Sequence, residues 1–331
     1  MPALVAALLV FGALAYALRA PPRPPVRAAP VCAADLKDIA PPPLSEKVTY
    51  AWRLGNRVGF PVVRGRIAAC DVGIFLDTGV SAPLMMSWFA DRLRLPRTHT
   101  GTIASDLGGY EGAVDATDEF PIFLDSIGID TKTSAISSGK DLLRYGIAAI
   151  VPPQLAVSKG RVVALDFTNG TYRRLASRAE ADELTRGRGP PIFDVESRCD
   201  AIIHVPLLIE GRPATFAVDT GSPITVLHSE SDAGRAVAAR IQRWETQDTT
   251  YGGTVEHVAI PNVHAAIGGM AGLMWIDVWK SRGQVGRPCG FDGVLGMDFL
   301  VDRHCLLLFE LGEEVGDSGL HYPRTRGFCR P

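Results

Sequence analysis

The chain contains the stretch AVDTG at residues 217–221, and it contains a close copy, FLDTG, at residues 75–79. In each copy an apolar run typical of a buried strand ends in one aspartate, which is followed by threonine and glycine. A carboxylate at the end of a buried strand is costly unless it is paired or used chemically. A single Asp-Thr-Gly is weak evidence, because such tripeptides often close ordinary turns. Two copies, 219 − 77 = 142 residues apart, indicate two matching halves whose aspartates form one site.

A pair of facing carboxylates has a defined chemistry. Both groups cannot ionise at close range, so they share one proton, and one acts as a base while the other acts as an acid. Asp77 and Asp219 are therefore the candidate acid and base. The alternative, in which both aspartates merely close turns, stays open at this point.

The similarity between the two halves extends beyond the aspartates. Four further landmarks recur at offsets of 140 to 144 residues, namely Tyr110 with Tyr251, Pro121 with Pro261, Ile127 with Ile267, and Asp166 with Glu310. A nearly constant offset predicts one β-rich unit that is duplicated. Helix candidates follow each Asp-Thr-Gly, at residues 88–95 and 231–244. We place the two units at residues 47–170 and 198–331, with a polar inter-lobe connection at 171–197 between them.

Composition agrees with two similar units and narrows the function. A length of 331 residues suggests two domains or lobes, and 34 glycines with 24 prolines favour a turn-rich, mainly β fold. The formal net charge of −2 gives no reason to expect a nucleic-acid partner. No HExxH or CxxC spacing is present, so we predict neither a metal site nor a cofactor.

The N-terminus predicts an extracytoplasmic protein, either periplasmic, secreted or membrane-anchored. Residues 3–18 are apolar, so we interpret residues 1–20 as a signal peptide or membrane anchor and the Pro-rich residues 21–46 as a linker. No Lys or Arg precedes the apolar stretch, which leaves its orientation open, and a buried N-terminal helix is the alternative. The six cysteines would be paired in part in an exported protein, and free buried thiols are the alternative.

These motifs resemble the pepsin and retropepsin superfamily of aspartic proteases. The resemblance covers roughly residues 50–170 and 198–312. It is most specific in the second unit, where DTGS at 219–222 is followed by DGVLGMDFL at 292–300. This second run is similar to the family's hydrophobic-hydrophobic-Gly element, which packs beside the catalytic loop. The resemblance implies a mainly β fold of two similar retropepsin-like β-barrel lobes, the pepsin-like acid protease fold, with a few short helices and a cleft between the lobes.

The resemblance also implies roles for individual residues. Asp77 and Asp219 would be catalytic, and Thr78 and Thr220 would hold the two catalytic loops together across the lobe interface. Gly79 and Gly221 would permit close backbone approach, and Ser222 would hydrogen-bond Asp219. In the family a hairpin of the first lobe covers the cleft as a flap, and here that hairpin would contain Gly109 and Tyr110. The alternative for this tyrosine is a half-buried strand residue.

The implied function is an aspartic endopeptidase that hydrolyses peptide bonds with a water activated by the two aspartates. It would act as a monomer on a peptide or protein substrate. Val80 and Pro152 differ from their counterparts in the second unit, Ser222 and Gly296. These differences favour the alternative of a catalytically inactive, aspartic-protease-like protein that binds peptides or acts as a sensor in the cell envelope. A structural envelope protein is a third hypothesis, which the N-terminal apolar segment alone motivates.

Overall fold

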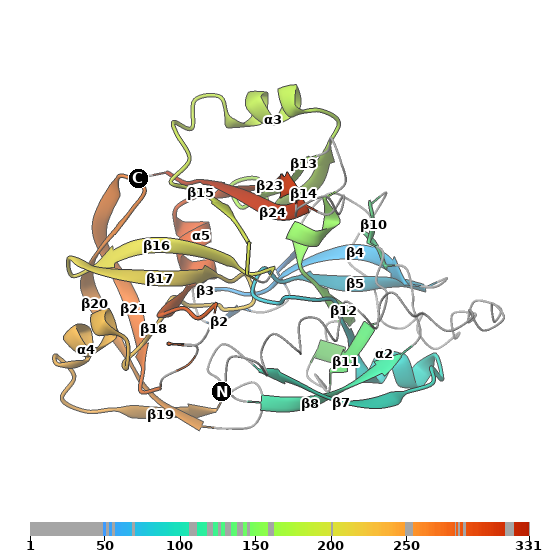
Figure 1. Ribbon diagram of the computed structural model, residues 1–331, viewed down its shortest axis with the longest axis horizontal. Coiled ribbons are helices and arrows are strands. Elements are labelled where there is room, and N and C mark those ends of the chain that lie inside the picture. Colours follow the sequence, from blue (N-terminus) through green and yellow to red (C-terminus); the bar gives the residue numbers. More distant parts are fainter. Residues whose placement is uncertain are drawn as a thin grey trace.

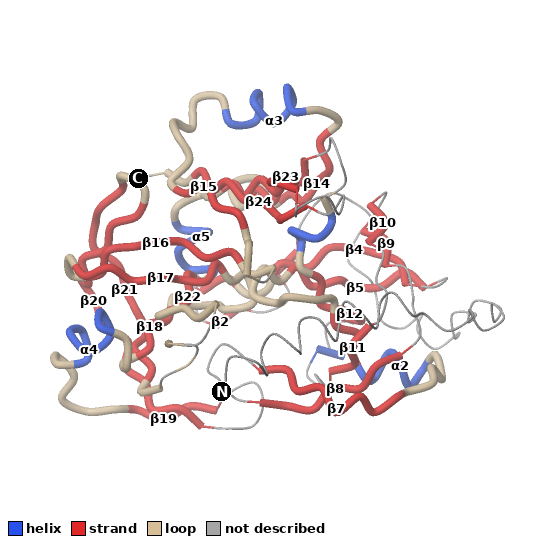
Figure 2. Tube along the Cα trace, in the orientation of Figure 1, coloured by secondary structure: helices blue, strands red, loops and turns tan. Residues whose placement is uncertain are grey.

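The structure of the protein is a computed structural model. It describes residues 49–50, 53–54, 57–67, 70–105, 111–117, 122–124, 127–129, 134–137, 142–143, 146–157, 162–199, 201–248, 254–281, 283, 285–286, 289–314 and 321–330. The predicted signal peptide or anchor and the Pro-rich linker therefore lie outside the described residues. Strands dominate the structure, as Figure 2 shows, so the prediction of a mainly β fold is confirmed.

The first sheet is built from the N-terminal half of the chain. Its strands run in the order β10-β9-β4-β5-β12-β6-β11-β8-β7, and β1 pairs with β4. The strands are β1 (Thr49–Tyr50), β4 (Pro61–Ile67), β5 (Cys70–Leu76), β6 (Leu84–Met86), β7 (Thr98–Ser105), β8 (Glu111–Thr117), β9 (Ile122–Leu124), β10 (Ile127–Ile129), β11 (Ser134–Ser137) and β12 (Ile147–Val151). A separate two-stranded sheet joins β2 (Arg53–Leu54) and β3 (Arg57–Val58).

The second sheet is built from the C-terminal half and runs in the order β16-β17-β22-β18-β21-β20-β19. An additional pairing of β16 with β20 closes six of these strands into a barrel. The strands are β16 (Ile203–Ile209), β17 (Arg212–Val218), β18 (Val226–His228), β19 (Glu245–Asp248), β20 (Thr254–Ile267), β21 (Met270–Trp279) and β22 (Gly293–Leu295).

The two sheets share one topology. The path β4-β5-β12-β6-β11-β8-β7 corresponds strand by strand to β16-β17-β22-β18-β21-β20-β19. All six neighbouring pairs agree in direction, with β5–β12 and β6–β11 parallel like β17–β22 and β18–β21, and with the other four antiparallel in both sheets. The internal repeat seen in the sequence therefore has a structural counterpart.

A third, bridging sheet joins the two halves. It runs in the order β14-β13-β23-β24-β15 and lies above the other two sheets in Figure 1, beneath α3. Its strands are β13 (Val162–Asp166), β14 (Thr171–Leu175), β15 (Phe193–Glu196), β23 (Leu306–Glu314) and β24 (His321–Phe328). Within it Ala164 pairs with Leu308, 144 residues further along the chain. The same ladder pairs Asp166 with Leu306, so it brings the ends of the two repeats together, and the match of Asp166 with Glu310 stays a prediction.

The landmark that matched Ile127 with Ile267 is wrong. Leu124 pairs with Ile127 across one hairpin, and Ile267 pairs with Met270 across the corresponding hairpin. The structural counterpart of Ile127 is therefore Met270, three residues beyond the Ile267 that the sequence comparison chose. Short apolar-Gly pairs recur within the same hairpin, and the sequence alone did not distinguish between them.

Local sequence explains the elements that lead into the two aspartates. In β16 the side chains alternate between buried and more exposed, as expected for a strand with one face in the barrel. The connection to β17 is the two-residue turn Glu210-Gly211, and both residues have positive φ, 50° and 74°. Such a turn matches the twist of a tight hairpin, and glycine adopts it without strain.

The described residues contain four α-helices and a short 3₁₀ helix, η3. They are α2 (Ser87–Arg92), η3 (Pro153–Ala156), α3 (Arg178–Thr185), α4 (Asp232–Ala238) and α5 (Met297–Asp302). Helices α2 and α4 confirm the two helices predicted after the Asp-Thr-Gly copies, although both are shorter than expected. In α4, Ser231 caps the first turn by accepting a hydrogen bond from Gly234 N. None of the helices in the described residues is long and apolar enough to span a membrane.

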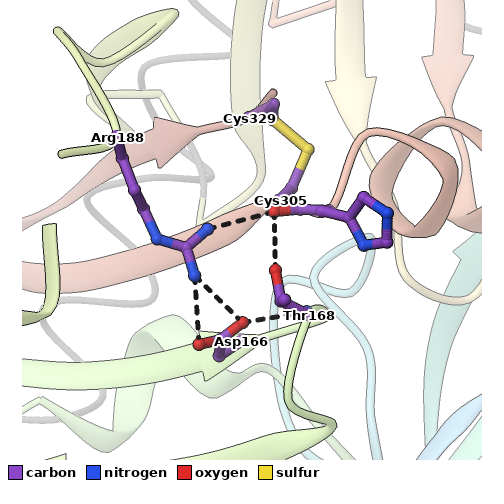
Figure 3. Close-up of a disulfide and its surroundings, with 6 residues drawn as sticks. Asp166, Thr168, Arg188, Cys305 and Cys329 are labelled. Atoms are coloured by element: carbon purple, nitrogen blue, oxygen red, sulfur yellow. Dashed lines mark hydrogen bonds and ion pairs between the residues drawn. A yellow bond between two sulfur atoms is a disulfide. The ribbon is translucent and has the colours of Figure 1, made fainter. Parts of the chain in front are cut away.

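Two disulfides link described residues, Cys199–Cys289 and Cys305–Cys329, and Cys70 is disulfide-bonded as well. Among the described cysteines none is free, so the paired alternative holds for them. Figure 3 shows Cys305–Cys329 beside the buried Asp166, whose carboxylate accepts hydrogen bonds from Thr168 N and Arg188. Arg188 and Thr168 also donate to the carbonyl of His304. The disulfide and this network therefore lie at the same end of the β23–β24 hairpin, where β23 begins and β24 ends, and they fix that end within the bridging sheet.

We predict that the Cys305→Ala/Cys329→Ala variant loses about 3 kcal/mol of unfolding free energy, because the disulfide closes a loop with a sequence separation of 24 residues. Denaturant unfolding of the oxidised wild type and of the variant measures the difference. Equal stabilities, or thiol trapping that labels Cys305 in the unreduced protein, would contradict the prediction.

Candidate active site

The two sequence copies occupy equivalent places in the two sheets. Asp77 directly follows β5 and Asp219 directly follows β17. The backbone N–H of Asp77 donates to the carbonyl of Val151 at 3.0 Å, and that of Asp219 donates to the carbonyl of Leu295 at 3.0 Å. Each aspartate is therefore the first residue after a buried strand that has a parallel neighbour. Its backbone is fixed by a hydrogen bond to that neighbour, and its side chain lies beyond the end of the strand.

The threonines join the two copies directly. The N–H of Thr78 donates to Oγ1 of Thr220 at 3.0 Å, and the N–H of Thr220 donates to Oγ1 of Thr78 at 3.0 Å. Each hydroxyl then donates across to the other copy, from Thr78 to the carbonyl of Val218 at 2.7 Å and from Thr220 to the carbonyl of Leu76 at 2.6 Å. Both threonines are completely buried. These four reciprocal hydrogen bonds bring the two loops together, as the resemblance implied for Thr78 and Thr220.

The glycines allow the carboxyl groups to approach each other. Gly79 N donates to Oδ1 of Asp77 at 2.8 Å, and Gly221 N donates to Oδ1 of Asp219 at 2.6 Å. A Cβ atom on Gly221 would lie 2.6 Å from Oδ2 of Asp77, and a Cβ on Gly79 would overlap the carboxylate of Asp219. Any side chain at either position would displace the opposite carboxylate. The glycines are therefore required by close contact across the pair.

The two carboxyl groups are hydrogen-bonded to each other, and both are almost fully buried. Burial raises the pKa of Asp77, although hydrogen bonds from Asp219, Gly79 and Gly221 act against it. The pKa of Asp219 is raised further, by burial first and then by the negative charge of Asp77. The pair therefore retains a shared proton at a pH where isolated aspartates have lost theirs.

The remaining predicted site residues have different outcomes. Ser222 lies in the loop after Asp219, and it hydrogen-bonds the Asp219 carboxyl group through its backbone N–H. Its hydroxyl, which was the expected donor, donates instead to the carbonyl of Ile224 at 2.6 Å. Gly109 and Tyr110 lie outside the described residues, and the flap stays a prediction.

Sequence reasoning missed one residue at this site, Gln154. Its side chain is 1% exposed, and Nε2 donates to the carbonyls of Thr78 at 3.1 Å and Ala201 at 2.8 Å. It stands three residues after Val151, where the second copy has Asp298 three residues after Leu295. That positional match is the signal that could have identified it.

The difference at Pro152 does not disturb the backbone next to Asp77. The hydrogen bond from Asp77 N to Val151 O has the same length as its counterpart at Asp219, and β12 runs parallel to β5 up to the pair Val151–Leu76. The amide hydrogen that proline lacks is not needed for this contact.

Among the residues that the structure describes, no group of three or more His, Cys, Asp or Glu side chains is placed to hold a metal ion. No known family model matches the chain, and no curated protein sequence matches it significantly.

The buried pair should make stability depend on pH. A raised folded-state pKa means that the folded chain binds more protons than the unfolded chain above 3.8, the ordinary pKa of an aspartate, so stability falls as pH rises through the folded pKa. We predict that Asp219→Asn is more stable than wild type at neutral pH and that this gain shrinks as pH falls towards 3.8. Urea unfolding across this range measures it.

Asp182→Asn controls for the loss of one negative charge, since Asp182 lies on α3 and is exposed. A gain at Asp219→Asn that is independent of pH, or a loss at neutral pH, would contradict the buried proton-sharing pair.

The reciprocal threonine bonds can be tested separately. We predict that Thr78→Val and Thr220→Val each cost about 2–4 kcal/mol, because each leaves a buried amide and a buried carbonyl unpaired. Thr→Ser at either position keeps the hydroxyl and should cost only about 1 kcal/mol for the methyl group. Denaturant unfolding measures the free energy of unfolding of each variant. Valine variants that are as stable as the serine variants would show that these hydrogen bonds do not hold the two loops together.

Proposed function

We propose that the protein is an aspartic endopeptidase with the bilobal, pepsin-like fold, in which each half of the chain forms a retropepsin-like lobe. The observation that carries the proposal is the hydrogen-bonded pair of buried carboxyl groups, Asp77 and Asp219. The pair stands on two loops of equivalent position that are locked together by Thr78 and Thr220. A purely turn-closing aspartate needs neither a second carboxyl group nor the burial that raises its pKa.

The arrangement supports hydrolysis with an activated water. One carboxylate of the pair is ionised and takes a proton from a water as the water attacks the peptide carbonyl. The protonated member donates its proton to the carbonyl oxygen, which gives a tetrahedral diol. The first carboxyl group then gives the proton that it took from the water to the peptide nitrogen as the C–N bond breaks, and the second takes a proton back from one hydroxyl of the diol. An amine and a carboxylic acid are released, and the pair again holds one proton.

The pKa of both carboxyl groups is raised by burial, so the pair as a whole holds one proton, and either member can serve as the acid while the other serves as the base. The reaction needs no group beyond the two carboxyls, the water and the peptide.

The proposed setting follows from the same features. One chain supplies both aspartates and both threonines, so a monomer forms a complete pair. The substrate is an extended peptide or an unfolded protein, and the hairpin around Gly109 and Tyr110 is proposed to cover it. The disulfides are compatible with an oxidising compartment, and we propose an extracytoplasmic location, secreted, periplasmic or anchored through the N-terminal segment.

We predict that Asp77→Asn and Asp219→Asn each abolish hydrolysis of an unfolded protein while the fold is retained, because one carboxyl group cannot perform both roles. Wild-type activity should follow a bell-shaped pH profile, with the acid limb marking loss of the single negative charge and the basic limb marking loss of the shared proton. Pepstatin should inhibit it. Proteolysis of a fluorescent casein from acidic to neutral pH measures these outcomes.

The exposed Asp71→Asn substitution on β5 is the matched control and should retain wild-type activity. If Asp77→Asn keeps most of the wild-type rate, the paired mechanism is wrong. If the wild type cleaves nothing at any pH, the inactive peptide-binding alternative replaces the protease.

A further inference from the structure

The loops that follow Asp77 and Asp219 occupy equivalent places in the two halves, but different residues form the hydrogen bonds that support them. Counting from the aspartates, Pro83 corresponds to Thr225. Counting from Val151 and Leu295, which accept equivalent hydrogen bonds, Pro152, Pro153 and Gln154 correspond to Gly296, Met297 and Asp298.

In the second loop these positions form a clamp. Met297 N donates to the carbonyl of Ser222 at 2.8 Å, and Gly296 N donates to Oγ1 of Thr225 at 3.2 Å. Asp298 accepts from the backbone N–H and the hydroxyl of Thr225, at 3.0 and 2.8 Å. The loop after Asp219 is thereby tied to its own half of the chain.

In the first loop every one of these backbone donors is absent, because each position is a proline, which has no N–H. The residues are Pro83, Pro152 and Pro153. A carboxylate at position 154 would have no counterpart of the Thr225 donors, and a buried charge without donors is costly. Glutamine at this position is consistent with the loss of the clamp.

Gln154 makes a different connection. Its Nε2 joins the carbonyl of Thr78, in the Asp77 loop, to the carbonyl of Ala201, in the segment that leads into β16. That segment is fixed by the disulfide of Cys199 with Cys289. Thr78 is therefore held at its N–H and hydroxyl by Thr220 and Val218, and at its carbonyl by Gln154.

The connection has a cost in stability. The side chain of Gln154 is buried, and its Oε1 has no hydrogen-bond partner among the described residues. An unpaired buried acceptor is unfavourable, and an apolar side chain of similar size would avoid it. Local violations of this kind are concentrated where function requires a particular geometry.

We propose that Gln154 is a positioning residue that holds the Asp77 loop against the second half of the chain, replacing the clamp that Asp298 and Thr225 provide for the Asp219 loop. The catalytic consequence rests on the proposed protease function, whereas the holding of the loop does not.

The test is Gln154→Met, which keeps the size of the side chain and removes the donor. We expect kcat to fall about tenfold with KM unchanged, as for the loss of one hydrogen bond that orients a reacting group. Hydrogen-exchange mass spectrometry should show faster exchange at residues 76–82 and unchanged exchange at 217–223. Gln242→Met, at an exposed position, is the matched control and should change neither quantity.

A second variant keeps the test decisive if the methionine variant does not fold. Gln154→Glu can donate only when its carboxyl group is protonated, so its activity should approach wild type at acidic pH, and the basic limb of its profile should shift to lower pH. Pro83→Thr combined with Gln154→Asp transplants the second-loop pair and should restore slow exchange at 76–82, which Gln154→Asp alone should lose.

Wild-type exchange at residues 76–82 in Gln154→Met, or equally faster exchange in both loops, would overturn the positioning role. An unshifted pH profile for Gln154→Glu would do the same. If the wild type hydrolyses nothing, the protease proposal fails, and the exchange measurement still decides whether Gln154 holds the loop.

Discussion

The four hydrogen bonds that Thr78 and Thr220 exchange are the constraint on which the rest of the site depends. They are the direct links between the ends of β5 and β17, and they place two carboxyl groups in contact that would otherwise repel each other. Each bond contributes about 1 kcal/mol, so together they help to offset the cost of burying the acidic pair. Gly79 and Gly221 follow from the same constraint, since the contact leaves no room for a side chain.

The pseudo-symmetry of the chain holds for the sheets but not for the residues that support the two loops. Sheet order and strand direction agree over the seven matched strands of each half, and β13 and β23 pair with each other in the bridging sheet. The supports behind the two loops have diverged, with an Asp–Thr clamp on one side and prolines with Gln154 on the other. A shared proton needs two carboxyls in contact, but it does not need the two loops to be held identically.

Much of this arrangement could be predicted from the sequence. The duplicated Asp-Thr-Gly identified both aspartates, both threonines and the β-rich halves, because motif and offset are local features. The bridging sheet could not be predicted. The sequence placed β13 and β23 at the ends of the two repeats, but no local sequence feature indicates that these two strands pair with each other. Gln154 was missed because its partners are backbone carbonyls, which carry no sequence signal. For the same reason the sequence did not predict that the hydroxyl of Ser222 would donate to the carbonyl of Ile224.

The most direct test of the central claim is an NMR titration of the side-chain carboxyl carbons in the protein labelled with ¹³C-aspartate, with Asp77→Asn and Asp219→Asn used for assignment. If the two aspartates share a proton, both carbons should report the same two well-separated titration steps, the upper one well above 3.8, the ordinary pKa of an aspartate. Two independent single steps near that value would show that the carboxyl groups do not form a pair.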